Sequence, residues 1–301
     1  MICPECKNKI KDKIITCPHC GRNINDENNS NKAKNLSRNR LIILFFTILF
    51  PLIICLSGII TVGGIIGYFY YKSDSYIISK YENQVKAKPD YVKAHLKLAE
   101  VYKSRYMYYQ AIEQYKSVIK LDPGDYKAYE GLGICYFLID KYSEAIEVLE
   151  KSVKINDKAF DSQYYLGKSY VRIDEYKKAL KQYNIAVKIK PDDEKLNNSI
   201  GYAYEHINDL AAAIEFYEKA IKLNREFSPP YSNLARVYST KQMYDKALYN
   251  AKKAIALEES CYNHYILGYV YEKTDDIDNA ISYYKKVIKC APSQNYGTYN
   301  R

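Results

Sequence analysis

A chain of 301 residues has room for about two domains, and its apolar share of 48% with mixed charges excludes a disordered protein. The formal net charge of +10 is uneven, because residues 1–40 carry nine Lys or Arg against four Asp or Glu, whereas residues 92–301 carry 32 against 28. The near balance of the long C-terminal part excludes a basic nucleic-acid groove there, and the uncharged run of residues 41–71 excludes a simple soluble enzyme.

Residues 1–24 contain two Cys-x-x-Cys pairs, Cys3 with Cys6 and Cys17 with Cys20, with ten residues between them. Zinc prefers four thiolates in a tetrahedron, and each Cys-x-x-Cys turn supplies two of them from one loop. So short a segment buries too little apolar surface to fold alone, so the metal would supply the folding energy. We therefore expect a structural Zn²⁺ site; a disulfide framework or four unrelated thiols are the alternatives. The stretch resembles the short N-terminal zinc ribbons of many bacterial membrane proteins, which implies a structural rather than a catalytic site.

Residues 25–40 form a basic polar linker, and residues 41–71 form an apolar run without a charged residue. Crossing the ~30 Å hydrocarbon core takes about 20 residues, so this run predicts one transmembrane helix. A cleaved signal peptide is the alternative, but it would need a shorter apolar core and a small-residue cleavage site. Gly63 and Gly67 have the spacing that lets two such helices pack closely, which offers one route to a homodimer.

The charges beside the apolar run predict its orientation. Four basic residues precede it, whereas two follow it within ten residues: Lys32, Lys34, Arg38 and Arg40 before, Lys72 and Lys80 after. Positive flanks stay cytoplasmic, and reduced zinc thiolates also suit the cytosol. We therefore expect a single-pass protein of the cell membrane with a cytoplasmic N-terminus and an extracytoplasmic C-terminal part.

Residues 92–301 carry an internal repeat with intervals of 34 residues and one of 33. Three columns recur in this rhythm: a small residue (Ala99, Gly133, Gly167, Gly201, Ala235, Gly268), a tyrosine three positions later (Tyr102, Tyr136, Tyr170, Tyr204, Tyr238, Tyr271) and an alanine (Ala111, Ala145, Ala179, Ala213, Ala247, Ala280). Each unit shows two stretches with apolar residues at helical spacing, separated by a short turn. One such helical hairpin cannot cover its own apolar face, so neighbouring hairpins must stack into a solenoid.

This pattern resembles the tetratricopeptide repeat family over residues 92–294. The six units are residues 92–125, 126–159, 160–193, 194–227, 228–260 and 261–294, followed by a tail of residues 295–301. The departures from the pattern are Asp157 and Arg225 in place of the closing proline, Ser152 in place of an alanine, and a fifth unit that is one residue short. The resemblance implies an all-α, right-handed superhelix of six helical hairpins, and residues 72–91 are expected to form a connecting half-repeat helix.

The resemblance also implies that the concave face of the superhelix holds an extended or helical peptide. The positions lining that groove, read from the first helix of each unit, are Leu96, Ile134, Phe137, Leu138, Tyr164, Tyr165, Lys168, Tyr202, Arg236, Tyr262, Tyr265 and Tyr269. This surface is aromatic with scattered cations, and the Lys/Asn/Arg clamp by which heat-shock co-chaperones of the family hold a C-terminal carboxylate is absent. Tyrosine-lined grooves suit sequence-tolerant binding, although tyrosines are also ordinary framework residues of this repeat.

No constellation of catalytic residues is evident. The histidines are His19, His95, His206 and His264, and two of them, His95 and His264, occupy a packing column that Tyr129 and Tyr231 hold in other units. No nucleophile, base and orienting group can be brought together from the sequence, so we expect no enzyme activity.

Cys261 and Cys290 stand near the start of the first helix and the end of the second helix of the last unit. An antiparallel hairpin would bring them close, so a disulfide and two free thiols both fit, and Cys135 would remain unpaired. The last unit is not followed by a polar capping helix, so a partner or a second copy could cover it; a frayed end is the alternative.

Together these features predict a membrane-anchored scaffold whose extracytoplasmic solenoid binds protein or peptide partners, in contact with the lipid bilayer and without nucleic acid. Two alternatives remain from the sequence. One is an adaptor at the cytoplasmic face that serves secretion or signalling, and the other is a regulatory membrane protein that responds to zinc or redox state.

Overall fold

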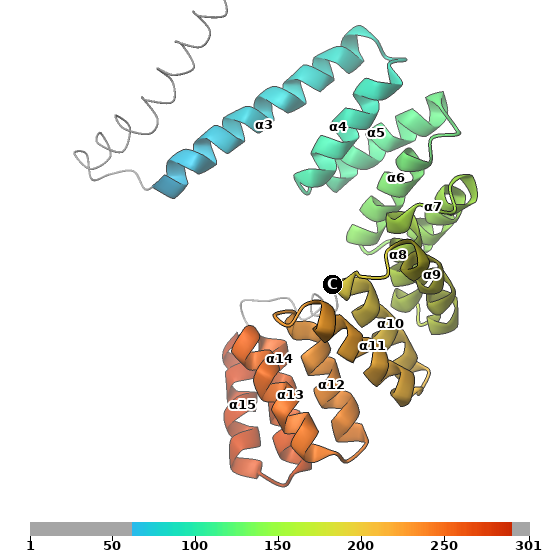
Figure 1. Cartoon of the computed structure of the whole chain (residues 1–301). Coiled ribbons are helices and arrows are strands. Elements are labelled where there is room, and N and C mark those ends of the chain that lie inside the picture. The colour runs from blue at the N-terminus through green and yellow to red at the C-terminus, as the bar shows by residue number, and fades with distance from the viewer. Residues whose placement is uncertain (1–61, 291–301) are drawn as a thin grey trace, which may run out of the picture. The chain divides into compact units, whose positions relative to one another are not determined.

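The computed structural model describes residues 62–290 of the chain, and within that range it contains thirteen α-helices and no β-strand (Figure 1). The predicted zinc ribbon of residues 1–24, the linker of residues 25–40 and the tail of residues 295–301 lie outside the described residues. The all-α class predicted from the repeat pattern is confirmed for the described part of the chain.

Helix α3 (Val62–Ala87) is the first described element. The chain divides into two compact units, residues 1–76 and 77–301, so the boundary between the units falls inside this helix. Residues 41–61 of the predicted membrane span lie outside the described residues, and residues 62–71 begin α3. None of the described helices combines the length and the apolar character that crossing a membrane requires.

The other twelve helices pair into six hairpins, each with a first helix of 13 residues and a second helix of 14 residues. The pairs are α4 (Val92–Ser104) with α5 (Tyr108–Leu121), α6 (Tyr126–Leu138) with α7 (Tyr142–Ile155), α8 (Phe160–Arg172) with α9 (Tyr176–Ile189), α10 (Glu194–His206) with α11 (Leu210–Leu223), α12 (Ser228–Thr240) with α13 (Tyr244–Leu257), and α14 (Cys261–Lys273) with α15 (Ile277–Cys290). The loop before α14, residues 258–260, is one residue shorter than the other loops between hairpins, which accounts for the single interval of 33 residues.

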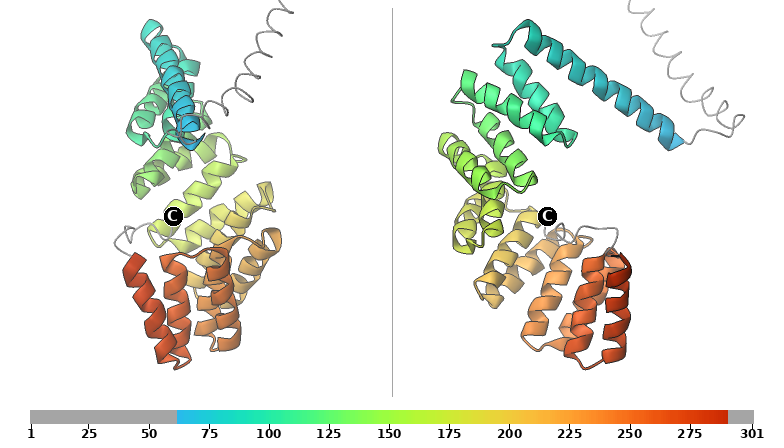
Figure 2. Two further views of the ribbon diagram at one scale, coloured as in Figure 1. Left: turned by 90° about the vertical axis from the view of Figure 1, so that its left-hand side faces the viewer. Right: turned by 180° about the vertical axis from the view of Figure 1, so that it is seen from behind.

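Successive hairpins stack in chain order. Each first helix contacts the first helix of the next hairpin, so α4, α6, α8, α10, α12 and α14 form one layer, and the second helices form the other (Figure 2). At the start of the stack, Ile78, Tyr81 and Val85 of α3 pack against the core of the first hairpin. This packing follows from the solenoid principle, in which each unit needs a neighbour to cover its apolar face.

The columns of the sequence repeat form the core. Each of the six alanines of the alanine column is buried, with an exposure of 3% or less. Where the small residue is glycine, it lets a large side chain of the second helix approach the first helix. A Cβ added at Gly201 would lie 2.7 Å from the ring of Tyr217, which is 0% exposed.

The tyrosine column fastens neighbouring hairpins to each other. The hydroxyl of Tyr170 donates to Glu150 at 2.5 Å, and the hydroxyl of Tyr238 donates to Glu218 at 3.1 Å. In each pair the carboxylate belongs to the second helix of the preceding hairpin. Tyr102 makes the same bond, at 2.6 Å, to a glutamate of α3.

In four of the six hairpins, the column that contains His95 ties the first helix to the backbone of the loop before it. His95 Nε2 lies 3.0 Å from the carbonyl oxygen of Pro89, and the amide of Asn197 donates to the carbonyl of Pro191 at 3.2 Å. Gln163 and Tyr231 likewise donate to the carbonyl six residues before them. The side chains of this column are therefore used in holding the loops between hairpins.

Each turn within a hairpin contains one residue in the left-handed region of backbone conformation. These residues are Tyr106, Asp140, Asp174, Asn208, Gln242 and Asp275, with φ between 57° and 64°. Asp and Asn tolerate this conformation better than other side chains, whereas Gly adopts it without steric cost. Four of the six turns therefore have a suitable residue, and the turns at Tyr106 and Gln242 do not.

Gln242→Gly is expected to raise the free energy of unfolding by about 1 kcal/mol, because the substitution removes the clash of a side chain in a left-handed backbone. Gln242 has a φ of 58° and is exposed, so no buried contact is lost. Urea unfolding measures the change. Asn208→Gly, at the equivalent position of the preceding hairpin, should give a clearly smaller gain, and equal gains would contradict the explanation.

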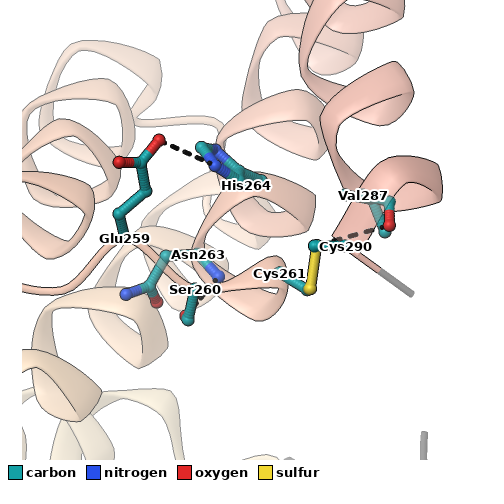
Figure 3. The surroundings of a disulfide bond; sticks show 7 residues. All are labelled: Glu259, Ser260, Cys261, Asn263, His264, Val287 and Cys290. Atoms are coloured by element: carbon teal, nitrogen blue, oxygen red, sulfur yellow. Dashed lines mark hydrogen bonds and ion pairs between the residues drawn. A yellow bond between two sulfur atoms is a disulfide. The ribbon is translucent and has the colours of Figure 1, made fainter. Parts of the chain in front are cut away.

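A disulfide joins Cys261 and Cys290, whose Cα atoms are 5.9 Å apart (Figure 3). It links the first residue of α14 to the last residue of α15, so it closes the open end of the sixth hairpin. Of the two arrangements left open by the sequence, the structure has the disulfide. Cys135 is a buried free thiol, and burial raises its pKa to about 12.

Candidate functional site

A concavity of about 1040 Å³ lies on the layer of first helices. Its lining comes from α8 and α10, from the start of α12, and from the loop before α14 together with the first turn of that helix, and Asp174, Tyr176 and Tyr183 add the turn after α8 and helix α9. Because these segments belong to four successive hairpins, the concavity exists only when the hairpins are stacked. The lining residues belong to the third, fourth, fifth and sixth repeats, and they include aromatic and charged side chains.

Five of the twelve predicted groove residues line this concavity. They are Tyr164, Tyr165 and Lys168 of α8, Tyr202 of α10 and Tyr262 of α14. A sixth, Arg236, lies directly behind the wall, because its Nη1 donates to the hydroxyl of Tyr262 at 2.6 Å.

The other predicted groove residues lie elsewhere. Ile134 and Phe137 are buried in the core, with exposures of 6% and 4%. Leu96 and Leu138 are partly buried against the cores of the first and third hairpins. Tyr265 is exposed and its ring lies 6.2 Å from that of Tyr284, and Tyr269 lies beneath the ammonium of Lys273.

The concavity also has walls that the sequence analysis missed. They include Arg172 at the end of α8, Lys195 and Asn198 at the start of α10, and Phe227 and Glu258 in loops between hairpins. Arg172, Lys195 and Asn198 stand at the repeat positions of the predicted Leu138, Tyr262 and Tyr164, but they had not been selected in their own units, and Phe227 and Glu258 lie in loops outside the first helices. The stacking of one hairpin on the next decides that they face the same space.

The α8 end of the concavity is positively charged. Lys168 Nζ lies over three rings, at 4.7 Å from the centroid of Phe137, 5.3 Å from that of Tyr165 and 5.6 Å from that of Tyr164. Burial, together with the positive charges of Arg172 and Lys195, lowers the pKa of Lys168 to about 8. Burial raises the pKa of Tyr164 to about 12, so this hydroxyl remains a neutral donor.

The opposite end is neutralised by an internal ion pair. Arg236 binds Glu205 with two bonds, from Nε to Oε1 at 2.6 Å and from Nη2 to Oε2 at 2.8 Å. Tyr217 donates to the same carboxylate at 2.8 Å, and the guanidinium lies 5.9 Å from the ring centroid of Tyr202. This cluster joins the wall residues Tyr202 and Tyr262 to an internal ion pair, so the charge of Arg236 is already matched by Glu205.

The predicted zinc ligands and the histidines were the other candidate functional residues of the sequence. Cys3, Cys6, Cys17 and Cys20 lie outside the described residues, so the zinc site stays a prediction. Among residues 62–290, His, Cys, Asp and Glu side chains form no group of three that would hold a metal ion. His206 is stacked on the ring of Tyr176, with the centroids 4.7 Å apart, and its ring is tilted against that of Tyr202 at 4.0 Å.

Two family models match the repeat region. The model for anaphase-promoting complex, cyclosome, subunit 3 matches residues 104–186, and the tetratricopeptide repeat model matches residues 194–227 and 263–294. None of the curated proteins matches the chain.

Many solved structures share the arrangement. A crystal structure of MamA is 30% identical, covering 55% of this chain and 96% of its own, with a TM-score of 0.49. YrrB, described as a tetratricopeptide-repeat protein with an unusual peptide-binding site, is 22% identical over 60% of this chain and 93% of its own, with a TM-score of 0.53. PilF of Pseudomonas aeruginosa is 17% identical over 67% of this chain and 93% of its own, with a TM-score of 0.58. The likeness to YrrB and PilF shows the fold.

These matches agree with the geometry of the described residues. Six hairpins of a 13-residue and a 14-residue helix stack in one direction, and the repeat models align with the same stretches. Repeats of this kind typically build non-catalytic scaffolds for protein interactions. The described residues therefore form a solenoid of the tetratricopeptide-repeat type, and residues 194–227 and 263–294 match the model of that repeat.

Proposed function

We propose that this protein is a membrane-anchored scaffold that binds an acidic, extended segment of a partner protein in the concavity of α8, α10, α12 and α14. The observation that carries the proposal is the concavity itself, with tyrosine rings along its wall and Lys168, Arg172 and Lys195 at one end. Its volume of about 1040 Å³ is sufficient for several residues of a peptide. The peptide-binding site by which YrrB is described supports the same use of the fold.

The charge of the partner follows from the electrostatics of the α8 end. Lys168 lies close enough to Arg172 and Lys195 for their charges to disfavour its protonation. A carboxylate placed among these groups would relieve their mutual repulsion and form charge-assisted hydrogen bonds. The tyrosine rings would contact the apolar parts of the same segment.

Selection from a random peptide library, with the full chain in detergent as bait, tests this proposal. Enriched peptides should contain Asp or Glu beside apolar residues, and Lys168→Met or Tyr202→Ala should weaken their binding by about tenfold or more. Lys222→Glu, an exposed change on α11 away from the concavity, should leave binding unchanged. Enrichment of basic peptides, or binding that ignores Lys168 and Tyr202, would overturn the proposal.

Binding of an acidic peptide is expected to weaken by about tenfold as the pH rises from 7 to 9. Lys168 has a pKa of about 8, below its ordinary value, so it is mostly charged at the lower pH and mostly neutral at the higher pH. Fluorescence anisotropy of a labelled peptide across this range measures the effect. Lys168→Arg keeps its charge throughout, so its affinity should stay nearly constant; a parallel decline in both proteins would contradict the role of Lys168.

The proposed anchor rests on the sequence alone. The zinc ribbon of residues 1–24 is proposed to lie in the cytoplasm, the span of residues 41–71 in the cell membrane, and the repeats outside. The disulfide of Cys261 and Cys290 supports an oxidising location for the repeats, since disulfides are rare in the cytosol.

Protease treatment of intact cells from which any wall has been removed, with tags at both ends of the chain, tests this topology. The C-terminal tag should be digested and the N-terminal tag protected. Protection of both tags until the membrane is opened would favour the alternative, an adaptor at the cytoplasmic face that serves secretion or signalling. Removal of zinc by a chelator should leave peptide binding intact; its loss would favour the alternative of a zinc- or redox-responsive regulator.

A further inference from the structure

The outer face of α15 has the residues of an interior helix but is left uncovered among the described residues. Helix α15 buries only Ala280, whereas the second helices of the five preceding hairpins bury three or four residues each. Tyr284 occupies the position that Tyr183 and Tyr217 hold in earlier hairpins, where the exposure is 1% or less. Tyr284 itself is only half-buried.

Three exposed isoleucines form an apolar stripe together with the outer side of Tyr284, whose ring packs against Gly268 and whose hydroxyl donates to Glu272 at 2.7 Å. Ile277, Ile281 and Ile288 are exposed by 52%, 47% and 68%, and Tyr284 stands between the last two. Intervals of four, three and four residues place all of them on one side of the helix. In a repeat protein a face of this kind is covered by an apolar neighbour, so the stripe is suited to an apolar partner.

The spacing of the apolar residues in the stripe is complementary to that of a second copy packed antiparallel. Its intervals read the same in both directions, so two α15 helices packed antiparallel would set Ile277 against Ile288 of the other copy and Ile281 against Tyr284 of the other copy. Such a two-fold arrangement is self-complementary, as in most homodimers. A parallel arrangement, in contrast, would place like residues and like helix ends side by side.

The charges beside the stripe also favour the antiparallel pair. Asp278 flanks the stripe near the start of α15, and Lys285 and Lys289 flank the same side within the last two turns of the helix. All three side chains are exposed. In the antiparallel register given by the stripe, Asp278 of one copy lies between Lys285 and Lys289 of the other, and the two-fold axis makes this contact twice.

We propose that two copies of this chain associate through the α15 faces of their last repeats, end to end. The helix is about 21 Å long, so the contact area is small and the association depends on protein concentration. The pair would place two peptide-binding concavities in one assembly. It would also give the uncovered end of each solenoid the apolar neighbour that inner hairpins have.

Sedimentation of the full chain in density-matched detergent, over a series of concentrations, tests the proposal. Asp278→Lys is expected to weaken the association by about tenfold, because lysines would then face each other across the axis. The double change Lys285→Glu and Lys289→Glu should weaken it similarly. All three changes together should restore it, and Ile281→Lys should abolish it.

Lys222→Glu is the matched control, because Lys222 of α11 holds the same position in its hairpin as Lys289 and should not affect association. Circular dichroism of each variant separates loss of association from loss of folding. A wild-type chain that is monomeric at every concentration, or association that none of these charge changes alters, would overturn the proposal. So would association that appears only after removal of residues 291–301, since that segment would then be the occupant of the stripe.

Discussion

Gly167→Ala is expected to lower the free energy of unfolding by about 2–3 kcal/mol. The added Cβ would overlap the ring of Tyr183, which packs from the second helix of the same hairpin and is 1% exposed. Since the interior around this ring is close-packed, relief of the overlap requires the two helices to move apart. Urea unfolding followed by circular dichroism measures the change.

The same substitution should be nearly neutral, within about 0.5 kcal/mol, when Tyr183→Ala is already present, because the overlapping ring is gone. The chain itself uses this combination in its fifth hairpin, where Ala235 and Ala251 hold the two positions. Gly124→Ala controls for the general effect of replacing glycine, since the nearest atom to its added Cβ lies 3.4 Å away. Equal losses from Gly167→Ala in both backgrounds would show that close packing against the ring is not the cause.

Reduction of the disulfide between Cys261 and Cys290 is expected to destabilise the sixth hairpin by about 3–4 kcal/mol, the typical effect of opening a loop of this length. The sixth hairpin is sensitive because α15 buries only Ala280, so few other contacts hold its far end. In a repeat protein such a loss appears first as local opening of the terminal unit. Faster hydrogen exchange of the α14 and α15 amides after addition of a reductant measures it.

Two variants show whether the reductant acts through this bond. The double variant Cys261→Ser and Cys290→Ser should exchange rapidly with or without the reductant. Cys135→Ala should respond to the reductant as the wild type does, because the Cys135 thiol is buried, has a pKa raised to about 12 and is not part of the disulfide. A response to the reductant that persists in the double variant would contradict the role of the bond.

The hairpins could be predicted from the sequence because their signals are local. The alanine column and the small-residue column repeat at one interval, and the structure buries every alanine of the first column. Helical spacing within some 30 residues is sufficient to place two helices and the turn between them. Even the shortened fifth unit was evident in the sequence, and the structure shows the missing residue in the loop of residues 258–260.

The candidate site could be predicted only in part. Lys168 and Tyr202 line the concavity as predicted, whereas Ile134, at the equivalent position of an earlier unit, is buried in the core. Equal positions in the repeat therefore have different surroundings. Lys195, at the repeat position of the predicted Tyr262, lines the site without having been predicted, and Phe227 enters it from a loop between hairpins.

The sequence by itself determined the helical class, the repeat and the members of the core columns, because each depends on spacing along a short stretch of chain. The tertiary structure alone decided which side chains of four hairpins share the concavity, that Cys261 and Cys290 are joined, and that the stripe of α15 has no cover among the described residues. The disulfide joins residues 29 positions apart within one hairpin, and the concavity joins residues up to about 100 positions apart. The stacking of whole hairpins brings the residues of the concavity together, and no periodicity within one unit encodes that stacking.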